Sequence, residues 1–65
     1  MTPGEMVRER REELGWTQTR LAEAAGTGQA LVSRVESGRV NPTVELLARL
    51  ADAMQAELSL SMSPR

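Results

Sequence analysis

The side chains with the clearest chemical potential lie close together, between residues 29 and 34. They are Gln29, Ala30, Ser33 and Arg34. Successive residues of a helix turn by about 100°, so these four fall on one side of it. A glutamine amide can make two hydrogen bonds to an adenine edge, an arginine can do the same with O6 and N7 of guanine, and an alanine can touch a thymine methyl group. We therefore predict that this surface faces base edges in the major groove of a duplex.

Two short helical patterns position these side chains. The first begins at Thr17, a typical N-cap residue, and we expect a helix at about residues 17–25. Its apolar positions form one buried stripe: Leu21, Ala22 and Ala25. Gly26 then ends the helix, as glycine commonly does just beyond a carboxyl terminus.

The second pattern covers about residues 28–36, and Gly38 closes it. Its inward side is marked by Leu31, Val32 and Val35. Two helices on either side of a short glycine-containing turn predict a helix-turn-helix, in which the second helix enters the major groove.

An amino-terminal helix is expected at about residues 3–14, because Thr2–Glu5 has the form of a capping box with proline in the first helical position. Gly15 follows it as a stop. Trp16, the only aromatic residue, precedes the Thr17 cap in the position of a hydrophobic staple. We expect Trp16 in the core, and the alternative is that it stacks on a base or fills a partner's pocket.

Arg11 lies on the inward face of this first helix, together with Val7 and Leu14. Removing one member of a buried ion pair costs about 3–5 kcal/mol, so a buried arginine needs a partner. Glu36 is the obvious candidate, and we predict an ion pair between Arg11 and Glu36. The alternative is that both side chains are solvated.

A fourth helix is expected after Thr43, with apolar side chains at helical spacing. They are Leu46, Leu47, Leu50 and Met54. This helix would cover the core. Leu47 and Met54 lie at the margin of the apolar stripe, so each belongs either to the core or to an interface with a second protomer.

Residues 57–63 change from helical spacing to strict alternation, which is a strand pattern. Leu58, Leu60 and Met62 alternate with serines. A single strand has no ladder partner for its amides and carbonyls, so we predict that it pairs antiparallel with the same strand of a second copy. The three apolar side chains would then form a dimer interface against the fourth helices. The alternative is a disordered tail.

These features together resemble the Xre/Cro, or lambda-repressor-like, helix-turn-helix family. The matching residues are Leu14-Gly15-Trp16-Thr17-Gln18, Leu21-Ala22, Gly26, Gln29, Val32-Ser33, Val35-Glu36, Gly38, Asn41-Pro42-Thr43, Leu46 and Leu50-Ala51. The resemblance covers about four-fifths of the chain. It implies an all-α fold, a compact four-helix DNA-binding domain over residues 1–56, followed by the short C-terminal β-strand at 57–63 that pairs across a homodimer.

Within the family, the chain is most similar to HipB-like antitoxin repressors. The likeness rests on the entry to the second helix at residues 15–18 and on the tail at residues 58–62. It implies an intermolecular strand at that tail, and the family also implies pairing of Arg11 with Glu36. A partner toxin is a further expectation, to be weighed against a plain homodimeric repressor.

Contacts to the DNA backbone are expected around the reading helix. Thr17 and Gln18 lie at the amino end of the preceding helix, where free amides and the helix dipole favour phosphate, and the family's matching glutamine implies a backbone clamp at Gln18. We also expect phosphate contacts from three residues that flank the reading helix, Thr27, Ser37 and Arg39. Two-fold symmetry would present two such helices about 34 Å apart and predicts an inverted-repeat operator.

Charge gives weaker guidance, since the net charge of −1 is unusual for a protein that neutralises phosphates. The charge is unevenly distributed. Residues 17–43 carry three arginines and two glutamates, whereas residues 1–16 and 44–65 each carry a net charge of −1. The acidic balance favours the main alternative function, a helix-turn-helix protein-interaction module without DNA binding. The positive segment and its polar face favour DNA.

The remaining composition bounds the class of protein. With 65 residues the chain forms one domain of marginal stability. Oligomerisation is the remaining means of adding to that stability. The chain has no cysteine, histidine or tyrosine, so we expect no metal or other cofactor and no enzymatic activity. No apolar run is long enough to span a bilayer, and the amino terminus lacks a signal peptide's hydrophobic segment. We therefore expect a cytoplasmic protein that does not bind a membrane.

Overall fold

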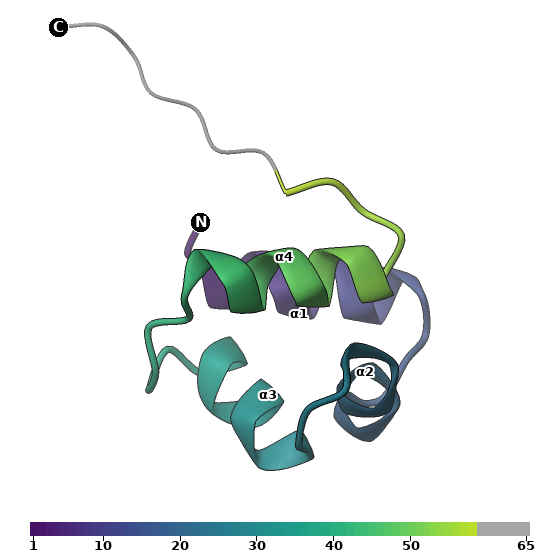
Figure 1. The fold of residues 1–65 in the computed structure, drawn as a ribbon, viewed down its shortest axis with the longest axis horizontal. Coiled ribbons are helices and arrows are strands. Elements are labelled where there is room, and N and C mark those ends of the chain that lie inside the picture. Colours follow the sequence, from purple (N-terminus) through teal and green to yellow (C-terminus); the bar gives the residue numbers. More distant parts are fainter. Residues whose placement is uncertain (59–65) are drawn as a thin grey trace, which may run out of the picture.

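Residues 1–58 are described by the structure, a computed structural model, and they form four helices (Figure 1). The helices are α1 (Pro3–Glu13), α2 (Gln18–Ala25), α3 (Gln29–Glu36) and α4 (Val44–Ala53). Figure 1 shows α1 and α4 together on one side of the molecule and α2 and α3 on the other. The described part of the chain is all-helical, as the sequence predicts.

Threonine side chains begin three of the four helices. The hydroxyls of Thr2, Thr17 and Thr43 each accept a hydrogen bond from the backbone amide three residues further on, at 3.1, 3.0 and 3.0 Å. These bonds satisfy amides that have no partner within the first turn of a helix. Helix α3 begins after Gly28, which supplies no side-chain cap.

The turn between α2 and α3 is stabilised from two directions. Gly26 has a φ of 69°, in the left-handed region, and the amide of Thr27 donates to the carbonyl of Ala22 at 2.9 Å. From α4, Nη2 of Arg49 donates to the carbonyl oxygens of Ala25 and Gly26 at 2.8 and 3.1 Å. The angle between the two helices is therefore supported by a cation at the carboxyl end of α2.

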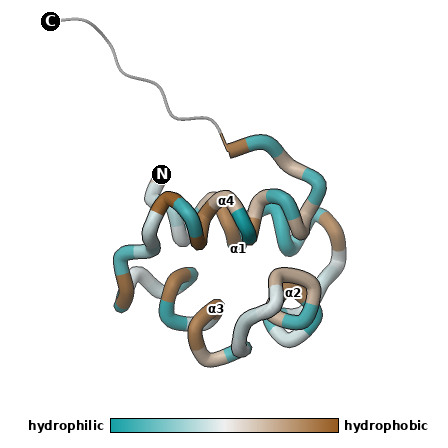
Figure 2. Tube along the Cα trace, viewed as in Figure 1, coloured by the Kyte–Doolittle hydropathy of each residue, from teal (hydrophilic) through white to brown (hydrophobic). Residues whose placement is uncertain are grey.

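One apolar core joins all four helices, and Figure 2 shows the brown hydrophobic positions recurring between teal ones along α3 and α4. The buried members are Val7, Leu21, Ala22, Ala25, Val32, Val35, Leu50 and Met54. Met54 is only 2% exposed, so it belongs to the core of the single chain. Leu47 is half-buried and packs against the edge of this core.

Trp16 packs against the same core and is half-buried. The guanidinium carbon of Arg20 lies 5.2 Å from the centroid of its ring, within the range of a cation–π contact. Arg20 therefore packs against one face of the indole.

Helices α1 and α3 approach each other closely at Gly4. A Cβ atom placed on Gly4 would overlap the carbonyl oxygen of Val35 and would lie 3.1 Å from that of Glu36. Only glycine fits at this crossing, although it lowers the intrinsic stability of the helix. The amino-terminal half of α1 is thus held against the carboxyl end of α3.

The predicted strand at residues 57–63 falls mostly outside the described residues, and Leu60 and Met62 lie there. Glu57 and Leu58, which are described, have no regular secondary structure in the single chain. Within residues 1–58, none of the four helices combines the length and apolar composition that crossing a bilayer requires.

Candidate nucleic-acid interface

The outer face of α3 carries the four residues that the sequence assigns to base recognition. Gln29, Ala30 and Arg34 are exposed, and Ser33 is half-buried. Within residues 1–58, no hydrogen bond or ion pair involves the side chain of Arg34. The face therefore presents one amide, one methyl group, one hydroxyl and one guanidinium that is available for a new contact.

Arg11 and Glu36 form a bidentate ion pair beneath this face. Nε of Arg11 lies 2.7 Å from Oε2 of Glu36, and Nη2 lies 2.9 Å from Oε1. The two side chains are 12% and 4% exposed. Nη1 of Arg11 also donates to the carbonyl of Trp16 at 2.7 Å, so the guanidinium joins α1, α3 and the segment before α2.

The environment of this pair favours the charged form of Arg11. Hydrogen bonding to the Glu36 carboxylate raises the pKa of the Arg11 guanidinium above its ordinary value, and burial opposes the rise without cancelling it. Arg11 therefore remains a cation wherever the protein is folded at moderate pH.

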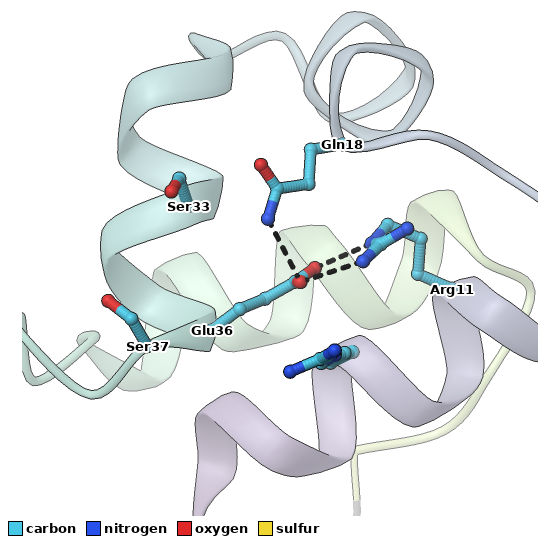
Figure 3. A pocket seen from close by; sticks show the side chains of 6 residues that line it. Arg11, Gln18, Ser33, Glu36 and Ser37 are labelled. Atoms are coloured by element: carbon cyan, nitrogen blue, oxygen red, sulfur yellow. Dashed lines mark hydrogen bonds and ion pairs between the residues drawn. The ribbon is translucent and has the colours of Figure 1, made fainter.

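Gln18 and Gln29 extend the ion pair to the surface. Nε2 of Gln18 donates to Oε1 of Glu36 at 3.2 Å, and Nε2 of Gln29 donates to Oε1 of Gln18 at 2.8 Å. Figure 3 shows Gln18 reaching from α2 toward Glu36, which Arg11 meets from α1. Arg11, Glu36, Gln18 and Gln29 thus form one hydrogen-bonded chain, called the glutamine relay below.

Chemistry determines the direction of every group in the glutamine relay. A carboxylate can only accept, so Gln18 must present its NH₂ to Glu36 and its oxygen to Gln29. Gln29 must then present its NH₂ to Gln18, which leaves its carbonyl oxygen and its second N–H unused by the relay. One acceptor and one donor are what an amide needs for a bidentate contact with N6 and N7 of adenine.

The residues assigned to the DNA backbone lie around the same face. Thr17 caps α2 with its hydroxyl, Thr27 is half-buried in the turn, and Arg39 is exposed beyond α3. Ser37 is the C-cap residue of α3, and its hydroxyl donates to the carbonyl of Arg34 at 3.2 Å. Gln18, expected to clamp a phosphate, uses one N–H on Glu36 and keeps the other for a further acceptor.

Between α1 and α3 the surface is hollowed next to the reading face (Figure 3). This α1–α3 hollow has a volume of about 230 Å³. Its lining consists of Arg8, Arg11, Gln18, Ser33, Glu36 and Ser37. Three residues assigned to DNA contacts therefore share one depression with the buried ion pair and with an arginine of α1.

Sequence reasoning missed two arginines that support the fold instead of the interface. Nε and Nη2 of Arg10 donate to the carbonyl of Met54, the C-cap residue of α4, at 3.2 and 3.0 Å. Arg49 does the same for the end of α2, as described above. The only signal in the sequence is the residue type, because an arginine fork is well suited to carbonyls at the negative end of a helix.

The dimer residues assigned from the sequence are only partly placed. Leu58 is half-buried and lines an apolar groove between α1 and α4 together with Met6, Leu47 and Ala51. Leu60 and Met62 lie outside the described residues. This α1–α4 groove takes Met6, Val7 and Arg10 from α1, a different set of residues from the Arg8 and Arg11 that line the α1–α3 hollow.

Comparison with known proteins identifies related sequences. A family model described as helix-turn-helix matches residues 7–60. The HTH-type transcriptional regulator SutR of Escherichia coli (strain K12) is 33% identical over 58 residues, which is 89% of this chain and 33% of SutR. An uncharacterized HTH-type transcriptional regulator of Methanothermobacter thermautotrophicus is 40% identical over 52 residues, 80% of this chain and 75% of that protein.

A viral protein is also similar to this chain. The ImmF control region 10 kDa protein of Bacillus phage phi105 is 30% identical over 57 residues, which is 88% of this chain and 63% of the phage protein. The chain thus spans between one third and three quarters of the length of these curated relatives.

Proposed function

Because this chain belongs to the Xre/Cro-like helix-turn-helix family, we propose that it is a transcriptional regulator that binds duplex DNA as a homodimer. In this proposal α3 reads an inverted-repeat operator, and occupancy of the operator represses transcription. The names of SutR and of the archaeal relative support a regulatory role. The geometry of α3 supports the reading mechanism.

The glutamine relay is the observation that carries the proposal. An exposed glutamine at the start of α3 would ordinarily sample several rotamers, and ordering such a side chain on binding costs free energy. Here Gln29 is already held by Gln18, which is held by a carboxylate that is 4% exposed. The free acceptor and donor of Gln29 are therefore presented in advance to an adenine edge, while Arg34 is available for a guanine.

Phosphate contacts would orient α3 in the groove. The second N–H of Gln18 points to a backbone clamp, and Thr17, Thr27, Ser37 and Arg39 lie around the reading face. Such contacts add affinity for every sequence and fix the register of the helix. Base preference would come from Gln29, Ala30, Ser33 and Arg34.

The homodimer is supported by the α1–α4 groove. Met6 is 48% exposed beside it, and Leu58 ends the described chain within it. The following residues continue the alternation of leucine, serine and methionine, so residues 57–63 of two chains would pair antiparallel and cover both grooves. The apolar contact would offset the small core of a 65-residue chain.

Selection from a library of randomised duplexes, at a stated low salt concentration, tests the proposal. We expect enrichment of an inverted repeat whose half-sites lie about one helical turn apart. Repeating the selection with Arg34→Ala should relax preference at one position of each half-site, since a bidentate pair discriminates by about 1–3 kcal/mol. Unchanged preference at every position would remove Arg34 from base reading.

Failure of the wild-type protein to enrich any sequence would favour the alternative, a protein-interaction module. The net charge of −1 and the four exposed glutamates on α1 would then count against DNA binding. An antitoxin combines the two activities, and the HipB-like resemblance supports that finer proposal. Its folded surface would have to hold the toxin, and copurification of a toxin from the native host, together with operator binding, is the expected result.

A further inference from the structure

Arg8 occupies a position on α1 that the charge count along the sequence does not reveal. Gly4, Arg8 and Arg11 are spaced by four and three residues, so they lie on one side of the helix. Gly4 lies so close to Val35 that a Cβ atom on it would overlap the Val35 carbonyl oxygen, and Arg11 pairs with Glu36. Arg8 lies between these two contacts, beside the carboxyl end of α3, and lines the α1–α3 hollow.

The charges that line the hollow favour an anion. The positive charge of Arg11 is balanced by Glu36, whose two carboxylate oxygens already accept from Arg11 and Gln18. Among the residues that line the hollow, Arg8 is the one charge without a counterion in that set, and on its other side it borders Glu5, Glu9, Glu12 and Glu13. Its one ion pair within residues 1–58 is with Glu12, at 3.6 Å between Nε and Oε1. The two side chains are 63% and 57% exposed, and exposed pairs of this kind contribute little to stability.

Neutral donors complete the lining. The hydroxyl of Ser33 and the second N–H of Gln18 belong to residues of the hollow, whereas the hydroxyl of Ser37 already donates to the carbonyl of Arg34. Its volume of about 230 Å³ is several times the roughly 30 Å³ that one water molecule occupies in the liquid. One positive guanidinium with hydroxyl and amide donors matches the single negative charge and the acceptor oxygens of a phosphodiester.

We propose that the α1–α3 hollow binds one phosphodiester of the DNA backbone through Arg8, and that the weak pair with Glu12 competes with this contact in the free protein. This inference rests on the proposed function, since it assigns a backbone contact to the same DNA complex. It adds α1 to an interface that sequence reasoning confined to residues 17–39. Arg8, which belongs to the acidic amino-terminal segment, would then add a positive charge at the edge of the reading face.

The test measures DNA affinity as a function of salt for the wild type, Arg8→Gln and Glu12→Gln, with the duplex enriched by selection and with a scrambled duplex. Removing one phosphate contact should reduce the slope of log K against log salt by about 0.9. We expect Arg8→Gln to produce that change and to weaken both duplexes alike, by roughly threefold to tenfold at low salt. Glu12→Gln should strengthen binding slightly more than removal of another exposed carboxylate, because it also removes the competing pair.

Glu13→Gln is the matched control, since it removes one exposed carboxylate from the same helix without removing the ion pair of Arg8. Equal gains from Glu12→Gln and Glu13→Gln would reflect net charge alone and would overturn the competition between Glu12 and the phosphodiester. An unchanged salt slope in Arg8→Gln would overturn the phosphodiester site. In that case a wild-type protein that still selects an inverted repeat would leave the proposed function intact, whereas no binding by the wild type would reject both.

A free anion is the other possible source of phosphate. Titration of inorganic phosphate, followed through the Nε–H resonance of Arg8, separates the two. A shift of that resonance with phosphate, combined with an unchanged salt slope for DNA, would assign the hollow to free phosphate and contradict the proposal. Loss of affinity restricted to one base sequence would make Arg8 a base-reading residue and would contradict it as well.

Discussion

The two sides of α1 are stabilised by opposite kinds of interaction. Toward α3, Arg11 contacts Glu36 through paired hydrogen bonds, and the glutamine relay continues to the surface. Toward α4, the helix contributes Met6 and Val7 to an apolar groove with Leu47. Hydrogen bonds are directional, whereas apolar contact depends on the area that is buried. In the proposed function the first side would position groups for DNA, and the second would hold two copies together.

The difference explains where this small protein uses its charged residues. A buried ion pair is weak evidence for stability, because desolvation offsets much of the attraction. Its clearer effect here is positional, since Glu36 determines the orientation of Gln18, and Gln18 determines that of Gln29. The core of Leu21, Val32 and Leu50 does not impose such directions, although it is fully buried.

The largest expected effect comes from breaking the relay at its base. Glu36→Ala leaves the Arg11 guanidinium buried without its carboxylate, and we expect the free energy of unfolding to fall by about 3–5 kcal/mol. Urea unfolding followed by circular dichroism measures it. Because the pKa of Arg11 is raised, its contribution is complete at pH values below the ordinary arginine range and is lost only as pH rises through the raised value.

The control for this prediction replaces both partners. Arg11→Met combined with Glu36→Leu removes both buried charges and should recover part of the lost stability. Recovery of folding without recovery of base preference would support the positional role of the pair. A loss of unfolding free energy below about 1 kcal/mol in Glu36→Ala would contradict the prediction for a buried pair, because exposed ion pairs contribute in that range.

A second prediction tests the close approach of α1 and α3. Gly4→Ala places a methyl group against the carbonyl oxygen of Val35, so α1 must shift, and we expect a loss of about 1–3 kcal/mol of unfolding free energy. Gly28→Ser is the matched control, because nothing lies within 4 Å of a Cβ there and serine is a good cap for α3. Thermal unfolding of both variants distinguishes them, and equal stability would show that the contact at Gly4 is not tight.

A third prediction, of similar size, concerns the α1–α4 groove and the dimer. Leu47→Asn should raise the dissociation constant of the homodimer by about tenfold to a hundredfold, since burying a leucine side chain contributes about 1.5–3 kcal/mol. Sedimentation equilibrium measures the constant. Ala48→Asn introduces the same amide one residue away, at an exposed position outside the groove, and should leave dimerisation unchanged. Identical constants for both variants and the wild type would place the interface elsewhere.

The helices could be predicted from the sequence because their signals are local. Thr17 marks the start of α2 and Gly26 its end, and both act within a few residues. The contact of Arg11 with Glu36 follows from a different argument, the need of a buried charge for a partner. Glycine inside a helix is costly and often marks a close approach, so Gly4 could have predicted the contact between α1 and α3.

Other features depend on tertiary geometry that no pattern encodes. Arg10 donates to a backbone carbonyl that lies 44 residues away in the sequence. Every residue has such a carbonyl, so the sequence does not indicate which one Arg10 contacts. The sequence places Gln18 and Gln29 on neighbouring helices, but their hydrogen bond depends on the angle that α2 and α3 adopt. The strand at residues 57–63 stays a prediction, because its partner would be a second chain.

The most direct test of the account follows the side-chain amides of the three glutamines by nuclear magnetic resonance while a duplex is added. Gln18 and Gln29 belong to the relay, whereas Gln55 lies beyond the end of α4 and serves as the internal control. We predict that the amide signals of Gln18 and Gln29 shift on binding and that those of Gln55 do not. Binding that leaves Gln29 unshifted, or that shifts Gln55 instead, would contradict the claim that the relay presents α3 to DNA.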